Sequence, residues 1–364
     1  MGRIMKSKRN GEIELLRFVF CLLVVLFHIN KNIFHLLSAN NYTYALSPRG
    51  YIGVEFFLML SGYFMALGID KKKNSLPLGT DTVRFIWKKY FSIFWYHIIA
   101  FCALFVVHTV INKDFSMDKF FDVIPGALLI TRSGVRFFDI NGVEWYISAM
   151  ILVMAAMYPV AKKHFEVYAK AIAPISAVLI YGWLIQKYHT LSGTTVWGPL
   201  GFRCMWRTAA GLNIGMFMYC CVKALKRHEF SNMEKNVAII ARIIMYASIC
   251  VYAMCRNPGK YEIYAVGVIF IALTLSFAFP HDNARWLDSK TVLYLGRLSL
   301  PLYLNQNLAI LLGKTYMINQ SDAVIVISIV LIDVILSVIC LWLGGKLTNS
   351  FNESKLNKIA LGIN

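Results

Sequence analysis

Residues 12–31 read EIELLRFVFCLLVVLFHINK, an apolar run that contains Glu14, Arg17 and His28. The run is long enough to cross a bilayer as a helix, which takes about 20 residues. An ionisable side chain at membrane depth is costly unless it is paired or meets water, so it marks a candidate functional site. Residues 13–30 are therefore expected to form a first membrane span that carries a polar stripe.

Arg17 and His28 are predicted to share one face of this helix. Their separation of eleven residues corresponds to about 1100°, or three turns and about 20°, at ~100° per residue. Along the helix axis they lie roughly 16 Å apart at ~1.5 Å per residue. Glu14, three residues before Arg17, lies within pairing distance on that face. This stripe needs protein or water beside it rather than lipid.

The composition of the whole chain is that of a membrane protein. Of its 364 residues, 58% are hydrophobic and 15% are charged, and the mean hydropathy is +0.58, which excludes an ordinary soluble domain. Apolar runs of about 20 residues recur, so we predict an all-α, polytopic transmembrane helix bundle. About ten spans are expected, near residues 13–30, 50–69, 90–111, 143–160, 168–186, 205–224, 237–255, 262–280, 297–313 and 322–345.

The net charge of +18 raises the alternative of a nucleic-acid partner, which we reject. The Lys and Arg residues cluster in short loops between the apolar runs, and such loops stay in the cytoplasm. This pattern places both termini in the cytoplasm, Arg17 near the cytoplasmic side of a cell membrane, and His28 nearer the outer leaflet. We expect one integral-membrane domain over residues 1–350 and a short polar cytoplasmic tail over residues 351–364.

Three ionisable residues in the first two spans are candidates for chemistry. His28 is the candidate for proton transfer, because imidazole ionises near neutral pH and can take a proton from a hydroxyl and return it. Arg17 would bind anionic or carbonyl groups, with a pair to Glu14, or extension of its side chain to the cytoplasmic surface, as an equal alternative. Glu55 would orient His28 or pair with a cation, or it is a polar contact between helices. Gly62, in the same run as Glu55, favours close helix packing.

Other polar residues receive structural interpretations. His97 and His108 are also eleven residues apart, and we interpret both as polar tips of an aromatic belt at the membrane interface. Asp333, in the tenth span, has no partner identifiable from the sequence, so we assign it a pairing or packing role. No clustered set of His, Cys and carboxylate ligands argues for a metal, and none is expected.

Two motifs resemble those of a known family. Arg17-x10-His28 and the run GVEFFLMLSG at residues 53–62 are similar to motifs of the membrane-bound acyltransferase type-3 family. Looser similarity follows in matching order along the chain, at residues 84–96, at WYIS in residues 145–148 and at LGRLSLPLYL in residues 295–304. The chain departs from the family at position 306, which is Gln where many relatives have His.

The resemblance implies an O-acetyltransferase. Relatives transfer an acyl group, usually acetyl from acetyl-CoA, to a hydroxyl of a cell-surface polysaccharide or its lipid-linked precursor. His28 would then be a general base or an acyl relay, with Arg17 and Glu55 as the other catalytic residues. The basic residues that would bind the acyl-CoA donor are Arg17, Arg84, Lys88 and Lys89.

Two other classes of function stay open. A secondary transporter or exporter of a glycan or small polar molecule is the alternative, because a polar stripe through a bundle can also line a permeation path. A non-catalytic sensor or assembly subunit is the third class. The chain has no paired half-helices broken by Gly or Pro, which weighs against one common transporter design. Membrane lipid is a partner in all three.

Overall fold

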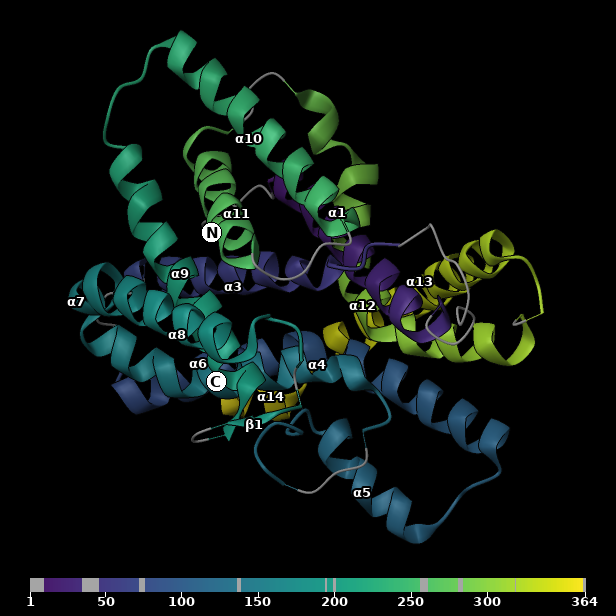
Figure 1. Ribbon diagram of the computed structural model, residues 1–364. Helices are drawn as coiled ribbons and strands as arrows, with labels where there is room; N and C mark the ends of the chain where they lie inside the picture. The colour runs from purple at the N-terminus through teal and green to yellow at the C-terminus, as the bar shows by residue number, and fades with distance from the viewer. Residues whose placement is uncertain are drawn as a thin grey trace.

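The computed structural model describes residues 10–34, 46–71, 76–135, 139–193, 195–198, 201–255, 261–280, 284–317 and 319–362. Within them the chain forms a bundle of helices (Figure 1). Helices suit apolar segments in lipid because every backbone N–H and C=O inside them is satisfied by the segment itself. Strand β1 (Trp197–Gly198) pairs antiparallel with β2 (Gly201–Phe202) in one short ladder.

The first half of the chain contributes α1 (Gly11–Ile29), η1 (Asn30–Phe34), η2 (Gly50–Ile52), α3 (Gly53–Lys71), α4 (Leu78–Asn112), α5 (Met117–Ala127), η3 (Gly142–Glu144), α6 (Trp145–Lys163), α7 (Phe165–Val167), η4 (Tyr168–Ile172) and α8 (Ala173–Tyr188). The second half contributes α9 (Arg203–Leu225), α10 (Asn232–Met254), α11 (Glu262–Ala278), η6 (Arg285–Asp288), α12 (Lys290–Tyr316), α13 (Asp322–Glu353) and α14 (Lys355–Ala360).

Seven helical segments of the described chain are long and apolar enough to cross a membrane by themselves. They cover Gly50–Lys71, Leu78–Asn112, Gly142–Lys163, Phe165–Tyr188, Arg203–Leu225, Asn232–Met254 and Asp322–Glu353. A helix also lies at each of the three other expected spans, in α1, α11 and α12. The all-α membrane fold is therefore confirmed, whereas the total of ten crossings and the cytoplasmic termini stay predictions.

Several helices extend beyond the spans expected from hydropathy, α4 and α13 among them. α4 begins at residue 78 instead of residue 90 and continues through Arg84, Lys88 and Lys89. These charged side chains lower the hydropathy, but they are good helix formers and do not interrupt the backbone hydrogen bonds. α13 runs to residue 353, and α14 then packs on α4, where Trp87 Nε1 donates to Asn357 Oδ1 over 3.0 Å.

Close contacts between backbones hold the centre of the bundle together. A Cβ atom on Gly62 of α3 would lie 2.1 Å from the carbonyl oxygen of Leu212 on α9, and one on Gly215 of α9 would lie 2.1 Å from that of Met59. Small residues that let helices approach closely are typical of membrane interiors. The close packing expected at Gly62 is confirmed. Figure 1 shows α10 and α11 on one side of α3, with α4 and α6 on the other.

Candidate active site

A cavity of about 440 Å³ lies at one end of the bundle. The C-terminal ends of α1, α4 and α12 and the N-terminal ends of α3, α6 and α9 surround it. In the orientation predicted from the charged loops, this is the outer end. Ligand pockets in helix bundles commonly form between helices and have volumes of about 300–1,000 Å³. The cavity is therefore large enough to hold one or two sugar rings.

His28 lies in the last turn of α1 and lines this cavity. Its Nδ1 is 3.0 Å from the carbonyl oxygen of Val24, one turn earlier. Because a carbonyl can only accept a hydrogen bond, the neutral ring carries its proton on Nδ1 and keeps a lone pair on Nε2. The side chain of Gln306, on α12, is a polar neighbour of the ring. His28 thus has the tautomer that a proton acceptor needs.

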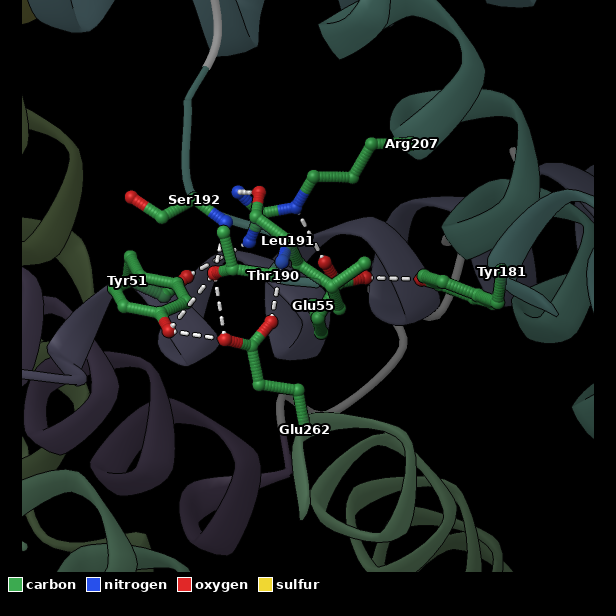
Figure 2. Close-up of polar contacts among 8 residues, drawn as sticks. All are labelled: Tyr51, Glu55, Tyr181, Thr190, Leu191, Ser192, Arg207 and Glu262. Carbon is green, nitrogen blue, oxygen red and sulfur yellow. Dashed lines mark hydrogen bonds and ion pairs between the residues drawn. The ribbon is translucent and has the colours of Figure 1, made fainter. Parts of the chain in front are cut away.

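Glu55 fixes a residue of the cavity wall rather than lining the cavity itself. It lies fully buried in the first turn of α3, where Oε1 accepts a hydrogen bond from Arg207 Nε over 2.6 Å and Oε2 accepts one from the Tyr181 hydroxyl. Arg207 lines the cavity and also donates to the carbonyl oxygens of Tyr51 (2.9 Å) and Leu191 (3.0 Å) (Figure 2). Glu55 thus pairs with a cation, and because Arg207 lies on α9 the pair is also the polar contact between helices that was the other interpretation.

Glu262 anchors the segment that follows α8 to the same network. Its carboxylate accepts hydrogen bonds from the Tyr51 hydroxyl, from the Thr190 hydroxyl over 2.7 Å and from the backbone N–H of Leu191 (Figure 2). A buried carboxylate is costly unless donors surround it, and here three donors do so. The next residue, Ser192, lines the cavity. The network therefore fixes one wall of the cavity, to which α3, α9 and the segment after α8 contribute, while Glu262 of α11 supports it from behind.

Arg17 lies at the other end of α1 and does not line the cavity. Its Nη1 is 3.1 Å from Glu14 Oε2, so the expected pair forms, and 32% of the Arg17 side chain stays exposed. Tyr146 interacts electrostatically with Arg17, and its ring packs edge-on against that of Tyr303 with 5.7 Å between centroids. Tyr303 lines the cavity. Tyr146, which interacts with Arg17, thus also contacts Tyr303 of the cavity wall.

The other residues expected to bind the donor lie on the first half of α4. Arg84 and Lys88 are one helical turn apart and share a face. Lys89 lies close enough to Arg17 for the two charges to interact. Arg84, Lys88 and Lys89 do not line the outer cavity. The structure therefore brings Lys89 together with Arg17. These two residues, with Arg84 and Lys88, form a basic group at the end of the bundle opposite His28.

The remaining sequence interpretations have different outcomes. The interpretation of His97 as a polar tip of an interfacial aromatic belt is wrong, because its side chain is fully buried in the protein and Nε2 lies 3.1 Å from the carbonyl oxygen of Gly126. The reason is that α5 folds back onto α4 and covers this face. His108 lines the cavity. Asp333 is buried within α13 and accepts a hydrogen bond from the Ser337 hydroxyl over 3.4 Å, as its packing role requires.

No group of three or more His, Cys, Asp or Glu side chains in the described part of the chain is arranged to hold a metal ion.

A family model for the acyltransferase domain matches residues 10–343. The chain belongs to the acyltransferase-3 family. Together with the apolar helices, membership of acyltransferase-3 makes it a multi-pass membrane acyltransferase. No curated protein and no solved structure matches the chain.

Sequence reasoning missed three basic residues of this acyltransferase-3 cavity. Arg207 lies three residues inside the sixth expected span, and an ionisable residue within a span is a functional signal. It was overlooked because it follows a polar stretch that resembles the end of a loop. Lys31 and Lys314 also line the cavity. Each directly follows a predicted span and resembles an ordinary flanking lysine in the sequence.

Proposed function

We propose that the protein is an integral-membrane O-acetyltransferase of the cell membrane. It moves an acetyl group from cytoplasmic acetyl-CoA to a hydroxyl of a cell-surface polysaccharide or its lipid-linked precursor. The observation that carries the proposal is the position of His28, whose Nδ1 is bound by the Val24 carbonyl while its ring lines the outer cavity. In a chain of the acyltransferase-3 family, this geometry supports proton transfer at Nε2.

In the direct route, the acceptor hydroxyl attacks the carbonyl carbon of the acetyl group. His28 Nε2 takes the hydroxyl proton as the new C–O bond forms, and the C–S bond to coenzyme A breaks. The proton then passes to the departing thiolate, which leaves as the thiol, and the imidazole is neutral again. The bond from Nδ1 to Val24 supports this step, since it stabilises the imidazolium that forms. General acid–base catalysis of this kind contributes about 10²–10⁴-fold to a rate.

In the relay route, His28 is itself acetylated for part of the cycle. Nε2 attacks the acetyl carbonyl, the C–S bond breaks and the thiolate leaves, which gives an acetyl-imidazolium. The acceptor hydroxyl then attacks this intermediate, the N–C bond breaks, and the hydroxyl proton goes to the thiolate. Both routes give the same products and use the same nitrogen. Trapping of acetyl-histidine after mixing with acetyl-CoA alone distinguishes them.

The basic group at the opposite end is the proposed donor site. Arg17, Arg84, Lys88 and Lys89 carry guanidinium and ammonium groups that bind phosphates. His28 is eleven residues from Arg17 on one helix, about 16 Å along its axis. That separation suits a long, thin donor arm that passes the Tyr146–Tyr303 pair, with the phosphates near Arg17 and the acetyl group near His28.

Purified protein in lipid vesicles tests this function. Acetyl-CoA labelled in the acetyl group is supplied on one side and surface polysaccharide on the other. The proposal predicts that labelled acetyl appears on the polysaccharide in equal amount to the thiol released. Movement of polysaccharide across the membrane without acetyl-CoA, and without acetylation, would instead identify a transporter and contradict the proposal.

A further inference from the structure

Two helices line the cavity with stripes that lead outward from His28 and end in lysine. On α1 and its extension η1, the lining residues Val24, His28 and Lys31 are four and three residues apart. Such spacings keep side chains on one helix face. On α12 the spacing is also helical, with lining residues at positions 303, 307, 310 and 314. Lys314 is the outermost residue of this stripe.

α1 and α12 pack directly against each other, so the two stripes border one space. A Cβ on Gly296 of α12 would lie 2.1 Å from the Glu14 carboxylate on α1. Further along, the Cys21 thiol donates to the carbonyl oxygen of Ser299 over 3.0 Å. In the predicted topology both helices run outward, since they form the first and ninth spans. Lys31 and Lys314 therefore both lie toward the outer mouth of the cavity.

The charges that line the cavity do not balance. Arg207 is neutralised by Glu55 at 2.6 Å, and Asp139, the acidic residue on the described lining, is paired with Arg132 at 3.2 Å. Lys31 and Lys314 have no acidic partner among the described residues. Lys31 is also close enough to His28 for its charge to act on the imidazole. The cavity lining thus carries two lysines near the proposed base that form no ion pair with a described acidic residue.

An excess of lysine at the outer end is opposite to the usual distribution, in which Lys and Arg concentrate in cytoplasmic loops. A lysine that only snorkels to the membrane surface needs no place in a cavity wall. Ammonium groups that line a cavity without a countercharge attract an anion from solution, because the walls of low dielectric constant focus the field. The missing negative charge is therefore expected on the ligand.

We infer that the acceptor is an anionic glycan, whose carboxylate or phosphate is bound by Lys31 and Lys314 while a nearby hydroxyl reaches His28. This inference rests on the proposed acetyl transfer and names the acceptor class of that site. Lys31 is three residues from His28, about 4.5 Å along the helix axis. The charged group and the acetylated hydroxyl consequently belong to the same sugar or to adjacent ones.

The test compares an acidic acceptor with its neutral ester, and adds a second anionic acceptor of different chemistry. A glucuronate-containing oligosaccharide, its methyl ester and a glycerol phosphate oligomer are offered to the protein in lipid vesicles with acetyl-CoA. Binding of each labelled probe is measured in parallel, so that the result does not depend on turnover. The wild-type protein should bind and acetylate at least one anionic probe in preference to the neutral ester. The two anionic probes distinguish a carboxylate from a phosphate.

Variants of the two lysines give the decisive comparison. The double variant Lys31→Ala/Lys314→Ala should lose roughly tenfold in binding of the anionic probe, as expected for two partly exposed charge pairs, with no change for the ester. Lys31→Arg/Lys314→Arg should retain the preference. Lys187→Ala, an exposed lysine outside the cavity lining, is the matched control. The KM for acetyl-CoA should not change in any of them.

Several outcomes would overturn the inference. Equal use of acid and ester, binding of neither anionic probe, or equal losses on both acceptors in the double variant would each do so. A lysine effect that appears only in vesicles of anionic phosphatidylglycerol, and not in phosphatidylcholine, would assign the lysines to lipid headgroups instead. Failure of acetyl transfer with normal, charge-dependent binding would contradict the proposed function while leaving the anionic ligand in place.

Discussion

Replacing Glu55 with Gln removes the negative charge beneath the cavity wall but keeps the shape of the side chain. An amide oxygen still accepts from Arg207 Nε, yet the guanidinium loses its countercharge. The Arg207 side chain is 2% exposed and that of Glu55 is 0% exposed, so water cannot compensate. Leaving one partner of a buried pair uncompensated costs about 3–5 kcal/mol. Because one hydrogen bond is retained, we expect a loss of about 3 kcal/mol in the free energy of unfolding.

Equilibrium unfolding of the purified protein in mixed detergent micelles measures this loss. Glu166→Gln is the control, since it makes the same substitution in an ion pair, Glu166–Lys170, whose side chains are 77% and 61% exposed. Exposed pairs contribute about 0–1 kcal/mol. Adding Arg207→Gln to Glu55→Gln removes the uncompensated charge and should recover part of the loss. If Glu55→Gln costs no more than the control, the reasoning about this pair is refuted.

Two further predictions concern the helix packing and the donor end. Gly62→Ala should destabilise the bundle by roughly 2–3 kcal/mol, because its Cβ would lie 2.1 Å from the Leu212 carbonyl oxygen. Gly68→Ala, with open space around it on the same helix, should be neutral. Equal thermal midpoints of the two variants in detergent would contradict this prediction. Arg17→Ala should raise the KM for acetyl-CoA about tenfold or more and leave the acceptor KM unchanged, with Lys355→Ala as the control. A raised acceptor KM alone would place Arg17 at the wrong end of the site.

Hydropathy predicted the helices well because burial in lipid imposes a single backbone structure on long apolar runs. The limits of individual helices were less predictable. The first four turns of α4 carry Arg84, Lys88 and Lys89, which lower the hydropathy without ending the helix. The helical period also predicted that His28 lies on a polar face, since that depends only on residues of one helix.

Contacts between helices that are distant in the chain could not be predicted from the sequence. Glu55 and Arg207 are 152 residues apart, and nothing local indicates that an acid on α3 meets an arginine on α9. The burial of His97 depends on α5 folding back so that the Gly126 carbonyl reaches the ring. Lys31 and Lys314 become part of one cavity only because α1 packs on α12. Tertiary packing decides all three.

The most direct test of the account is the activity of His28→Ala and His28→Gln at matched levels in the membrane. The proposed role of Nε2 predicts that acetyl transfer from acetyl-CoA to the acceptor falls about 100-fold or more in both variants. The control His228→Ala, an exposed histidine between α9 and α10, should retain full activity. Turnover near that of the wild type in His28→Ala would contradict the account.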